Sequence, residues 1–225
     1  MDRVVVVGAS LAAVHAIETL RHHDFSGEIV LVGEEPHLPY DRPPLSKEGL
    51  RQPPEPDLLR SREWYADSGV TLVLGRAASE VNATERAVLL TDGSQVRYEG
   101  LVIATGSRVR TLGRGDEHIH YLRTVDDGAR LHEQLSGGEH VAVIGGGFIG
   151  LEVAATLTDM GCSVTVVEVA PVPLTRVLGD QVGEWFHKLH VRHSVTIHCG
   201  RPAVSTEAAG DGYTVTVGGG EQVRA

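Results

Sequence analysis

The feature that most constrains this chain is a Gly-rich turn between an apolar strand and a helix. The apolar run Val141–Ile144 leads directly into Gly145-Gly146-Gly147-Phe148-Ile149-Gly150, and helical periodicity continues through Met160. A second expected strand, the β-branched run Val164–Val167, then ends at Glu168. Strand, turn, helix and strand in this order predict a βαβ unit with parallel strands.

The three glycines and the acidic residue each have a physical role in such a unit. Gly145 permits the tight turn, Gly147 lets a pyrophosphate approach the backbone, and Gly150 lets the helix pack closely on the strand. The helix N-terminus, which includes Ile149, supplies N–H groups and partial positive charge. Glu168 is placed to accept a hydrogen bond from a ribose 2′-OH, and it would repel a 2′-phosphate. The pattern therefore predicts a dinucleotide site that prefers NADH to NADPH.

The same plan occurs at the start of the chain in a less complete form. Its expected elements are the strand Val4–Val7, the helix Leu11–Leu20 and the strand Ile29–Val32. The turn begins at Gly8, but the middle glycine is replaced by Ser10, and the third position is Ala13, which the pattern allows. Glu34 follows the second strand at the ribose position. The repeat predicts a second dinucleotide site.

The repeat extends beyond the turns and defines the expected fold. The sequence from Gly69 to Arg76 is echoed from Ser194 to Arg201, and that from Gly93 to Arg97 is echoed from Gly220 to Arg224. We expect an α/β fold with two tandem Rossmann-like domains, each with a largely parallel sheet and a small antiparallel meander in three layers. The expected boundaries are 1–108 and 109–225. The first unit is longer because of a Pro-rich stretch, 38–59, which cannot be helix interior or central strand.

Composition narrows the function classes. The net charge is −10, so a broad electrostatic footprint for nucleic acid or anionic membrane is not expected. No apolar run reaches the length of a membrane helix and no signal peptide is apparent, which favours the cytoplasm. Cys162 and Cys199 have no CxxC or zinc-ligand spacing, and we expect both to be buried structural thiols.

Two charged clusters are interpreted as surface features. His187, His190 and His193 lie three residues apart, but no carboxylate or Cys completes a metal site, so solvated helix histidines are expected. The basic residues Arg108, Arg110 and Arg114 could attract an acidic protein partner, or they could be solvated charges of a linker. We assign no site to either cluster.

The motifs together resemble one family. VVVVGASLAA, LVGEEPHLPYDRPPLSK, LVIATGSR, YLRT and VAVIGGGFIGLEVAATL stand in the order found in FAD-dependent NADH:ferredoxin reductases of the putidaredoxin reductase and rubredoxin reductase type. These belong to the wider pyridine nucleotide-disulfide oxidoreductase superfamily. The resemblance covers the whole chain and implies that FAD occupies the first site and NADH the second.

The resemblance also implies roles for individual residues. It places Lys47 beside the flavin, where its charge stabilises the reduced ring, and Glu152 beside the nicotinamide, able to pair with Lys47. It places Thr105 and Gly106 where the chain passes the FAD and leaves the first domain. The other positions that match FAD contacts, apart from the first Gly-rich turn, are Ala12, Glu34, Arg42, Ala78 and Arg123.

The cysteines distinguish branches of this superfamily. Disulfide reductases carry a CxxxxC pair after the first βαβ unit, whereas this chain has PYDRPPLSK there. Electrons are therefore expected to pass from the flavin directly to a ferredoxin or rubredoxin. An NADH oxidase, a nitrite-reductase-like or apoptosis-inducing-factor-like relative, or a non-catalytic nucleotide-binding remnant would share the same motifs.

The end of the repeat carries one further expectation. After Gly93–Arg97 the first unit continues into the strand Leu101–Ala104, whereas after Gly220–Arg224 the chain has only Ala225. We expect the second domain to be incomplete. We also expect the returning FAD segment and C-terminal interface domain of the family to be absent, and the separate chain to hold FAD weakly.

Overall fold

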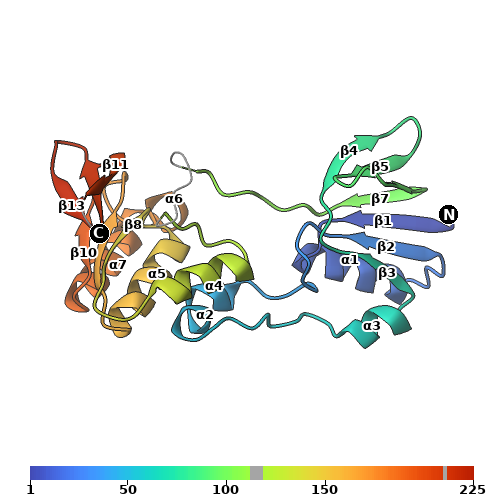
Figure 1. Ribbon diagram of the computed structural model, residues 1–225, viewed down its shortest axis with the longest axis horizontal. Helices are drawn as coiled ribbons and strands as arrows, with labels where there is room; N and C mark the ends of the chain where they lie inside the picture. The colour runs from blue at the N-terminus through green and yellow to red at the C-terminus, as the bar shows by residue number, and fades with distance from the viewer. Residues whose placement is uncertain (112–118, 210–211) are drawn as a thin grey trace. The chain divides into compact units, whose positions relative to one another are not determined.

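The computed structural model describes residues 1–111, 119–209 and 212–225, which form two compact units (Figure 1). Unit 1 contains residues 1–42 and 56–111, and unit 2 contains residues 43–55 together with the described residues from 119 onward. The division into units therefore differs from the expected single domain boundary at residue 108. Residues 43–55 precede that boundary in the sequence but pack with unit 2.

Unit 1 is a three-layer α/β unit. Its elements are β1 (Arg3–Val7), α1 (Leu11–His22), β2 (Glu28–Val32), α3 (Arg62–Asp67), β3 (Val70–Val73), β4 (Ala78–Asn82), β5 (Ala87–Leu90), β6 (Gln95–Arg97) and β7 (Gly100–Ile103). A parallel sheet has the order β3-β2-β1-β7, and an antiparallel sheet has the order β4-β5-β6. The strands expected at Val4–Val7 and Ile29–Val32 and the helix between them are confirmed.

The alternation of side chains along β1 explains the layers of unit 1. Val4 and Val6 pack with Ile17 of α1 on one face of the sheet, while Val5 and Val7 pack with β5 on the other face. Successive residues of a strand point to opposite faces, so a strand buried on both faces must be apolar throughout. This requirement accounts for the unbroken valine run of β1.

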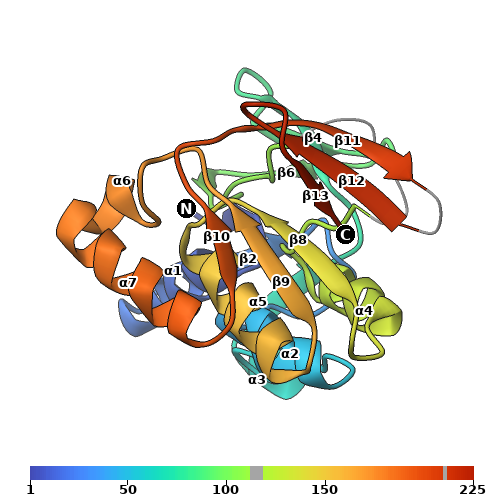
Figure 2. The ribbon, with the colours of Figure 1, turned by 90° about the vertical axis from the view of Figure 1, so that its left-hand side faces the viewer.

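Unit 2 repeats this architecture. Its elements are the 3₁₀ helix η1 (Pro43–Ser46), α2 (Glu48–Arg51), α4 (Val125–Gln134), β8 (His140–Ile144), α5 (Phe148–Asp159), β9 (Ser163–Val167), α6 (Thr175–Leu178), α7 (Asp180–Arg192), β10 (Thr196–His198), β11 (Ala203–Ala209), β12 (Gly212–Val217) and β13 (Gln222–Arg224). The parallel sheet has the order β10-β9-β8 and the antiparallel sheet the order β11-β12-β13. Figure 2 shows the antiparallel sheet on one side of the parallel sheet and α5 on the other.

The expected fold class is confirmed in both units, since each combines a parallel sheet, covering helices and an antiparallel three-stranded sheet among its described residues. The Pro-rich stretch contains the short helices η1 and α2. Pro43 and Pro44 open η1, where a helix does not need the missing proline N–H groups. α2 then brings Leu50, which is fully buried, into the core of unit 2 beside Val153 and Leu157 of α5.

Two further contacts hold the segment 43–55 on unit 2. The guanidinium of Arg51 lies 2.9 Å from a carboxylate oxygen of Asp159, and Nδ1 of His132 lies 2.9 Å from the carbonyl oxygen of Leu50. These contacts connect positions more than 80 residues apart, which explains why the local sequence pattern did not indicate them.

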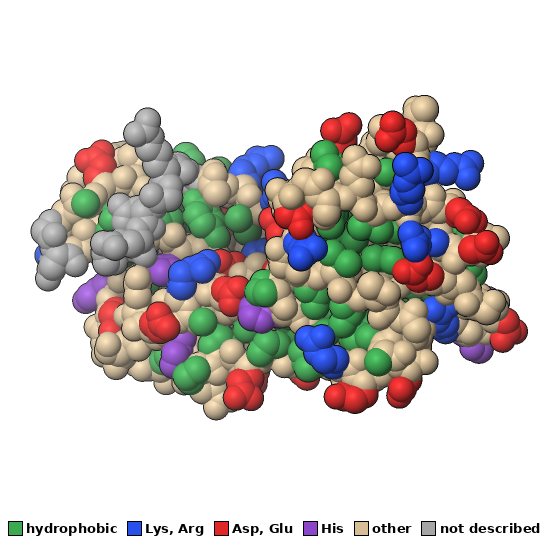
Figure 3. Space-filling view, turned by 45° about the vertical axis from the view of Figure 1, so that its right-hand side comes forward, with side chains coloured by type: hydrophobic (Ala, Val, Ile, Leu, Met, Phe, Trp, Pro, Cys, Tyr) green, Lys and Arg blue, Asp and Glu red, His purple; other side chains and the backbone are tan. Residues whose placement is uncertain are grey.

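The surface is mixed in charge. Figure 3 shows acidic and basic side chains interspersed on the visible face of both units. Among the residues that the structure describes, no helix is both long enough and apolar enough to cross a membrane.

Candidate nucleotide-binding site

The Gly-rich turn of unit 2 has the geometry of a phosphate cradle. Gly145 has φ of +107°, a conformation that favours glycine, and a Cβ at Gly150 would overlap the carbonyl oxygen of Gly145. Gly147 is the N-cap of α5 and provides no side-chain acceptor for the first N–H groups of the helix. These groups have no intrahelical partner and face an anion favourably, so the turn fits a pyrophosphate.

Glu168 lies at this turn, directly after β9. Its Oε2 accepts a hydrogen bond from the N–H of Gly146 at 2.6 Å, and its Oε1 accepts one from the N–H of Ala170 at 2.7 Å. Both oxygens are thus held by backbone donors, which fix the carboxylate in one orientation next to the Gly-rich turn. A carboxylate so oriented is an acceptor for the hydroxyls of a ribose.

The turn of unit 1 has the same form with different packing. Gly8 has φ of +105°, and a Cβ there would overlap the carbonyl oxygen of Ala104. Ser10 is the N-cap of α1, but its side chain does not cap the helix. Ala12 is exposed at the first turn of α1, whereas Ala13 is fully buried against the sheet. The uncapped N-terminus of α1 therefore also fits a phosphate group.

The acidic residues after β2 differ from those after β9. Glu34 is exposed. The neighbouring Glu35, which the sequence analysis did not single out, accepts hydrogen bonds from Tyr40 Oη at 2.5 Å and from Arg42 Nη2 at 2.6 Å. The guanidinium of Arg42 also lies over the Tyr40 ring, 5.4 Å from its centroid. Arg42 is thus fixed in a partly buried network instead of extending into solvent.

The remaining predicted residues of unit 1 lie at two places. Thr105 and Gly106 follow β7 and are exposed, and a Cβ on Gly8 would also crowd the backbone nitrogen of Thr105, so the first turn and the end of β7 are adjacent. Ala78 opens β4 and packs against the core between the two sheets.

Lys47 and Glu152 are brought together within unit 2, although they are far apart in sequence. Lys47 Nζ lies 2.9 Å from Glu152 Oε2 and also donates to the carbonyl oxygen of Pro43 at 3.0 Å. Ser46 Oγ donates to the same Oε2 of Glu152 at 2.5 Å. In the described part of the chain, Glu152 Oε1 and one of the three ammonium N–H groups of Lys47 have no protein partner and are available to a ligand.

The environment of Glu152 favours its ionised form. Partial burial opposes ionisation, but the hydrogen bond from Ser46 and the hydrogen bond and charge of Lys47 outweigh it, so the pKa of Glu152 lies below its ordinary value. The pair is therefore a carboxylate and an ammonium.

Arg123 lies just before α4 and helps to fix its start. Its backbone N–H donates to Asp127 Oδ2 at 3.0 Å, and the Thr124 N–H donates to the same oxygen at 2.7 Å. Thr124 Oγ1 in turn accepts from the N–H of Asp127 at 3.1 Å, completing a capping box. The backbone that carries Arg123 is thus fixed by the helix start.

Exposed apolar side chains flank both turns, and the sequence analysis missed all of them except Ile149. In unit 1 these are Leu11 and Ile103, which are 48% and 66% exposed. In unit 2 they are Phe148, Ile149 and Val169, which are about half exposed. Apolar side chains left open at the carboxyl ends of parallel strands are suited to cover the flat rings of a ligand.

The expectation that the clustered histidines are solvated needs correction at one position. His190 is not solvated: it is buried, and its Nδ1 and Nε2 lie 2.9 Å and 3.2 Å from the carbonyl oxygens of Phe186 and Leu151. This burial follows from the packing of α7 against α5, while His193 is exposed as expected. Arg108 and Arg110 are exposed, whereas Arg114 lies outside the described residues.

The cysteines are free thiols. Cys162 is buried, as expected, but Cys199 is only partly buried. Burial raises the pKa of both thiols, so both are poor nucleophiles near neutral pH.

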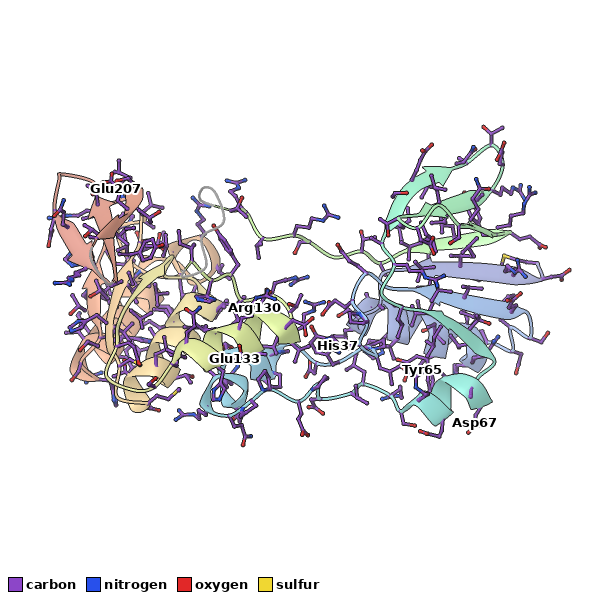
Figure 4. The ribbon with its side chains drawn as sticks, viewed as in Figure 1. His37, Tyr65, Asp67, Arg130, Glu133 and Glu207 are labelled. Carbon is purple, nitrogen blue, oxygen red and sulfur yellow. The ribbon has the colours of Figure 1, made fainter. Side chains whose placement is uncertain are left out.

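A separate pocket lies beside α4. It has a volume of about 370 Å³ and is lined by Ile119, His120, Tyr121, Asp127, Arg130, Glu133 and Gln134. Figure 4 shows Arg130 and Glu133 on this helix. The pocket contains none of the residues predicted to bind a nucleotide.

Comparisons with known proteins agree with this geometry. The sequence profile of the pyridine nucleotide-disulphide oxidoreductases matches residues 2–225. The chain is 39% identical to the ferredoxin–NAD(+) reductase component of the p-cumate 2,3-dioxygenase system of Pseudomonas putida, covering 94% of this chain and 53% of that protein. It is 37% identical to rhodocoxin reductase of Rhodococcus erythropolis, covering 99% of this chain and 53% of that protein.

A solved structure shows the same fold. The chain superposes on the reductase of a covalent putidaredoxin reductase–putidaredoxin complex with a TM-score of 0.93 and 34% identity, covering 100% of this chain and 56% of the other. The chain spans about half the length of the curated relatives that it matches.

Proposed function

Because the chain belongs to the pyridine nucleotide-disulphide oxidoreductase family, we propose that it is a flavoprotein oxidoreductase that passes electrons from NADH through FAD to a ferredoxin or rubredoxin type protein. The observation that carries the proposal is the presence of one phosphate cradle with a following acidic residue in each unit. Two such cradles in one chain fit two dinucleotides. The proposal is supported by the relatives, which include a ferredoxin–NAD(+) reductase component and a rhodocoxin reductase.

We assign the FAD to the first cradle. The α1 N-terminus would hold its pyrophosphate, and the exposed Glu34 would accept from its ribose. The proposed FAD residues of unit 1 are Gly8, Ser10, Ala12, Ala13, Glu34, Arg42, Ala78, Thr105 and Gly106. Those of unit 2 are Lys47 and Arg123.

NADH is assigned to the second cradle. The α5 N-terminus would hold its pyrophosphate, and Glu168 would accept from the ribose hydroxyls with a carboxylate already oriented by Gly146 and Ala170. The proposed NAD residues are Gly145, Gly147, Ile149, Gly150 and Glu168. A 2′-phosphate would meet the negative charge of Glu168, which favours NADH over NADPH.

Lys47 and Glu152 are the proposed catalytic residues. Bound FAD would supply the redox chemistry, accepting a hydride from NADH and releasing single electrons. Lys47 would offer its remaining N–H and its positive charge to the flavin ring as negative charge develops there. Glu152 would keep Lys47 in place through Oε2 and would present Oε1 as an acceptor to the nicotinamide amide.

The proposed electron acceptor rests on the low reactivity of the two cysteines and on the similarity to ferredoxin and rhodocoxin reductases. A dithiol relay needs a reactive thiol pair, whereas burial raises the pKa of both Cys162 and Cys199. Cys162 directly precedes β9, and Cys199 directly follows β10. We therefore propose direct transfer to an iron-sulfur or iron protein. A cytoplasmic location is proposed with it, because free thiols are typical of reducing compartments.

The proposal is tested by replacing Lys47 with alanine in the chain loaded with excess FAD. Lys47→Ala should slow flavin reduction by NADH on the order of a hundredfold, because a donor that acts on developing charge is lost. The dissociation constant of NADH should change less than about threefold. Stopped-flow absorbance of the flavin band measures the rate, and a fluorescence titration measures binding.

Arg51→Ala is the matched control, since Arg51 is an exposed cation of the same segment that pairs with Asp159. It should leave the reduction rate unchanged. An unaltered rate in Lys47→Ala, or equal losses in both variants, would contradict the proposed role of Lys47.

A further inference from the structure

Ser46 is a buried polar residue at the centre of the Lys47–Glu152 pair. It is one of the few buried polar residues in the described part of the chain, with 5% of its surface exposed. Its hydroxyl donates to Glu152 Oε2 at 2.5 Å. Lys47 Nζ binds the same oxygen at 2.9 Å. The last residue of η1 and the residue that follows it thus bind the same carboxylate oxygen of Glu152 in α5.

The hydroxyl proton of Ser46 has two possible acceptors. The carbonyl oxygen of Pro43 lies at 3.3 Å, whereas Glu152 Oε2 lies at 2.5 Å and carries negative charge. A hydroxyl has one proton to donate, and hydrogen bonds to a charged acceptor are shorter and stronger than those to a neutral one. The proton therefore goes to the carboxylate.

The backbone of Ser46 is fixed at a second point on the same helix. Thr156 Oγ1 donates to the carbonyl oxygen of Ser46 at 2.8 Å, and this bond is buried. Thr156 follows Glu152 by four residues, so the two side chains lie on the same face of α5. Ser46 is therefore held by α5 through both its side chain and its main chain.

We propose that Ser46 is a positioning residue that orients the Glu152 carboxylate, and that Thr156 fixes Ser46 for this task. By occupying Oε2 together with Lys47, Ser46 turns Oε1 toward a ligand and keeps the carboxylate and the ammonium in contact. The proposal rests on the proposed function, in which Lys47 and Glu152 act on the bound nucleotides. The sequence signal was present in PPLSK, where Ser46 precedes Lys47, but only the lysine was singled out.

The charged surroundings of Glu152 are simple enough for a clear prediction. Lys47 is the charged group in direct contact with it. Farther along the same contact between the segment 43–55 and α5, Arg51 pairs with Asp159, and the α4 residue His132 contacts the Leu50 carbonyl. Among the described residues, Ser46 is the neutral donor to Glu152, and loss of its hydroxyl should raise the pKa of this carboxyl.

The test is an NMR titration of the glutamate side-chain carboxyl carbons in the chain without added nucleotide. Ser46→Ala should move the midpoint of Glu152 to higher pH, because the charged form loses its hydroxyl donor. Ser46→Thr retains a hydroxyl and should restore the wild-type midpoint. Thr156→Val should shift the midpoint in the same direction as Ser46→Ala, by less.

Thr158→Val is the matched control. Thr158 lies on the same helix but donates to Ala154 within α5, so the midpoint of Glu152 should not move. An unchanged midpoint in Ser46→Ala would overturn the proposal. If Ser46→Ala fails to fold, Ser46→Gly takes its place as the variant without a hydroxyl, and an unchanged midpoint there would overturn the role of Ser46. A wild-type midpoint in Thr156→Val would overturn the role of Thr156.

Flavin reduction by NADH then separates this proposal from the proposed function. In the FAD-loaded chain, Ser46→Ala should slow reduction on the order of tenfold, with the acid limb of the pH profile moved to higher pH. A shifted Glu152 midpoint with unchanged reduction in both Ser46→Ala and Lys47→Ala would support the positioning of the pair and contradict its role in catalysis.

Discussion

The two units build the same turn but crowd it at different glycines. In unit 1, β7 lies beside β1, and the backbone of Ala104 closes on Gly8, while the third position of the turn accepts the buried methyl of Ala13. In unit 2, a Cβ on Gly145 would meet no described atom within 4 Å, and the close approach occurs at Gly150. The same strand-turn-helix plan thus meets two different packing demands.

The acidic residues of the two turns also differ. Glu34 is exposed, whereas both oxygens of Glu168 accept backbone hydrogen bonds at 2.6 Å and 2.7 Å. Equivalent positions in a repeat therefore need not be equally organised before a ligand binds. Unit 2 therefore holds its proposed ribose acceptor in one orientation, whereas the proposed acceptor of unit 1 is exposed.

The largest difference is expected on adding a methyl group to the first glycine of each turn. Gly8→Ala should destabilise unit 1 by roughly 3 kcal/mol or more. The new methyl group would force the backbone of Ala104 to shift, and alanine would be strained at the positive φ of this position. Gly145→Ala should cost unit 2 only about 1–2 kcal/mol, the cost of the positive φ alone. Urea unfolding can follow the units separately through Trp64 of α3 and Trp185 of α7, each studied with the other replaced by Phe.

Gly93→Ala is the control within unit 1. Gly93 has φ of +82° and open space around its Cβ position, so its cost should match that of Gly145→Ala. Equal costs for Gly8→Ala and Gly93→Ala would show that Ala104 yields to the methyl group without penalty.

The next effect concerns the two acidic residues. The chain should bind NADH about a hundredfold more tightly than NADPH, because in the proposed site Glu168 would face the 2′-phosphate with like charge. Glu168→Gln should reduce this preference about tenfold or more, while Glu34→Gln should leave it unchanged. Fluorescence titrations with both nucleotides measure the ratio, and an equal response to the two substitutions would refute the assignment of NADH to unit 2.

The smallest effect distinguishes a capped helix from an uncapped one. Thr124→Ala removes the capping box of α4 and should cost unit 2 about 1 kcal/mol. Ser10→Ala should cost unit 1 no more than a few tenths of a kcal/mol, because the Ser10 side chain caps no N–H. Urea unfolding with the same tryptophan reporters gives both values, and a Ser10→Ala cost as large as that of Thr124→Ala would show that Ser10 caps α1 in solution.

Local pattern was sufficient for the elements that form the two sheets. The run Val4–Val7 is apolar at every position, and Val164–Val167 is apolar at every position except Thr165. Both faces of these strands pack in a core, and this property can be read from the local sequence. The positive φ of Gly8 and Gly145 is likewise a property of a single residue in a tight turn. The fold class and the two candidate cradles therefore followed from the sequence.

Long-range contacts decided the rest. Ser46 and Glu152 lie more than 100 residues apart in sequence, and the packing of α2 on α5 brings them into contact. The same packing makes residues 43–55 part of unit 2. The same applies to His190, which was expected to be solvated but whose ring is buried and lies against the Leu151 carbonyl of α5. The sequence by itself determined the strands and Gly-rich turns of the two parallel sheets, because their backbone geometry depends on neighbouring residues. Tertiary structure decided which side chains meet, because burial and hydrogen bonding depend on residues that no local pattern connects.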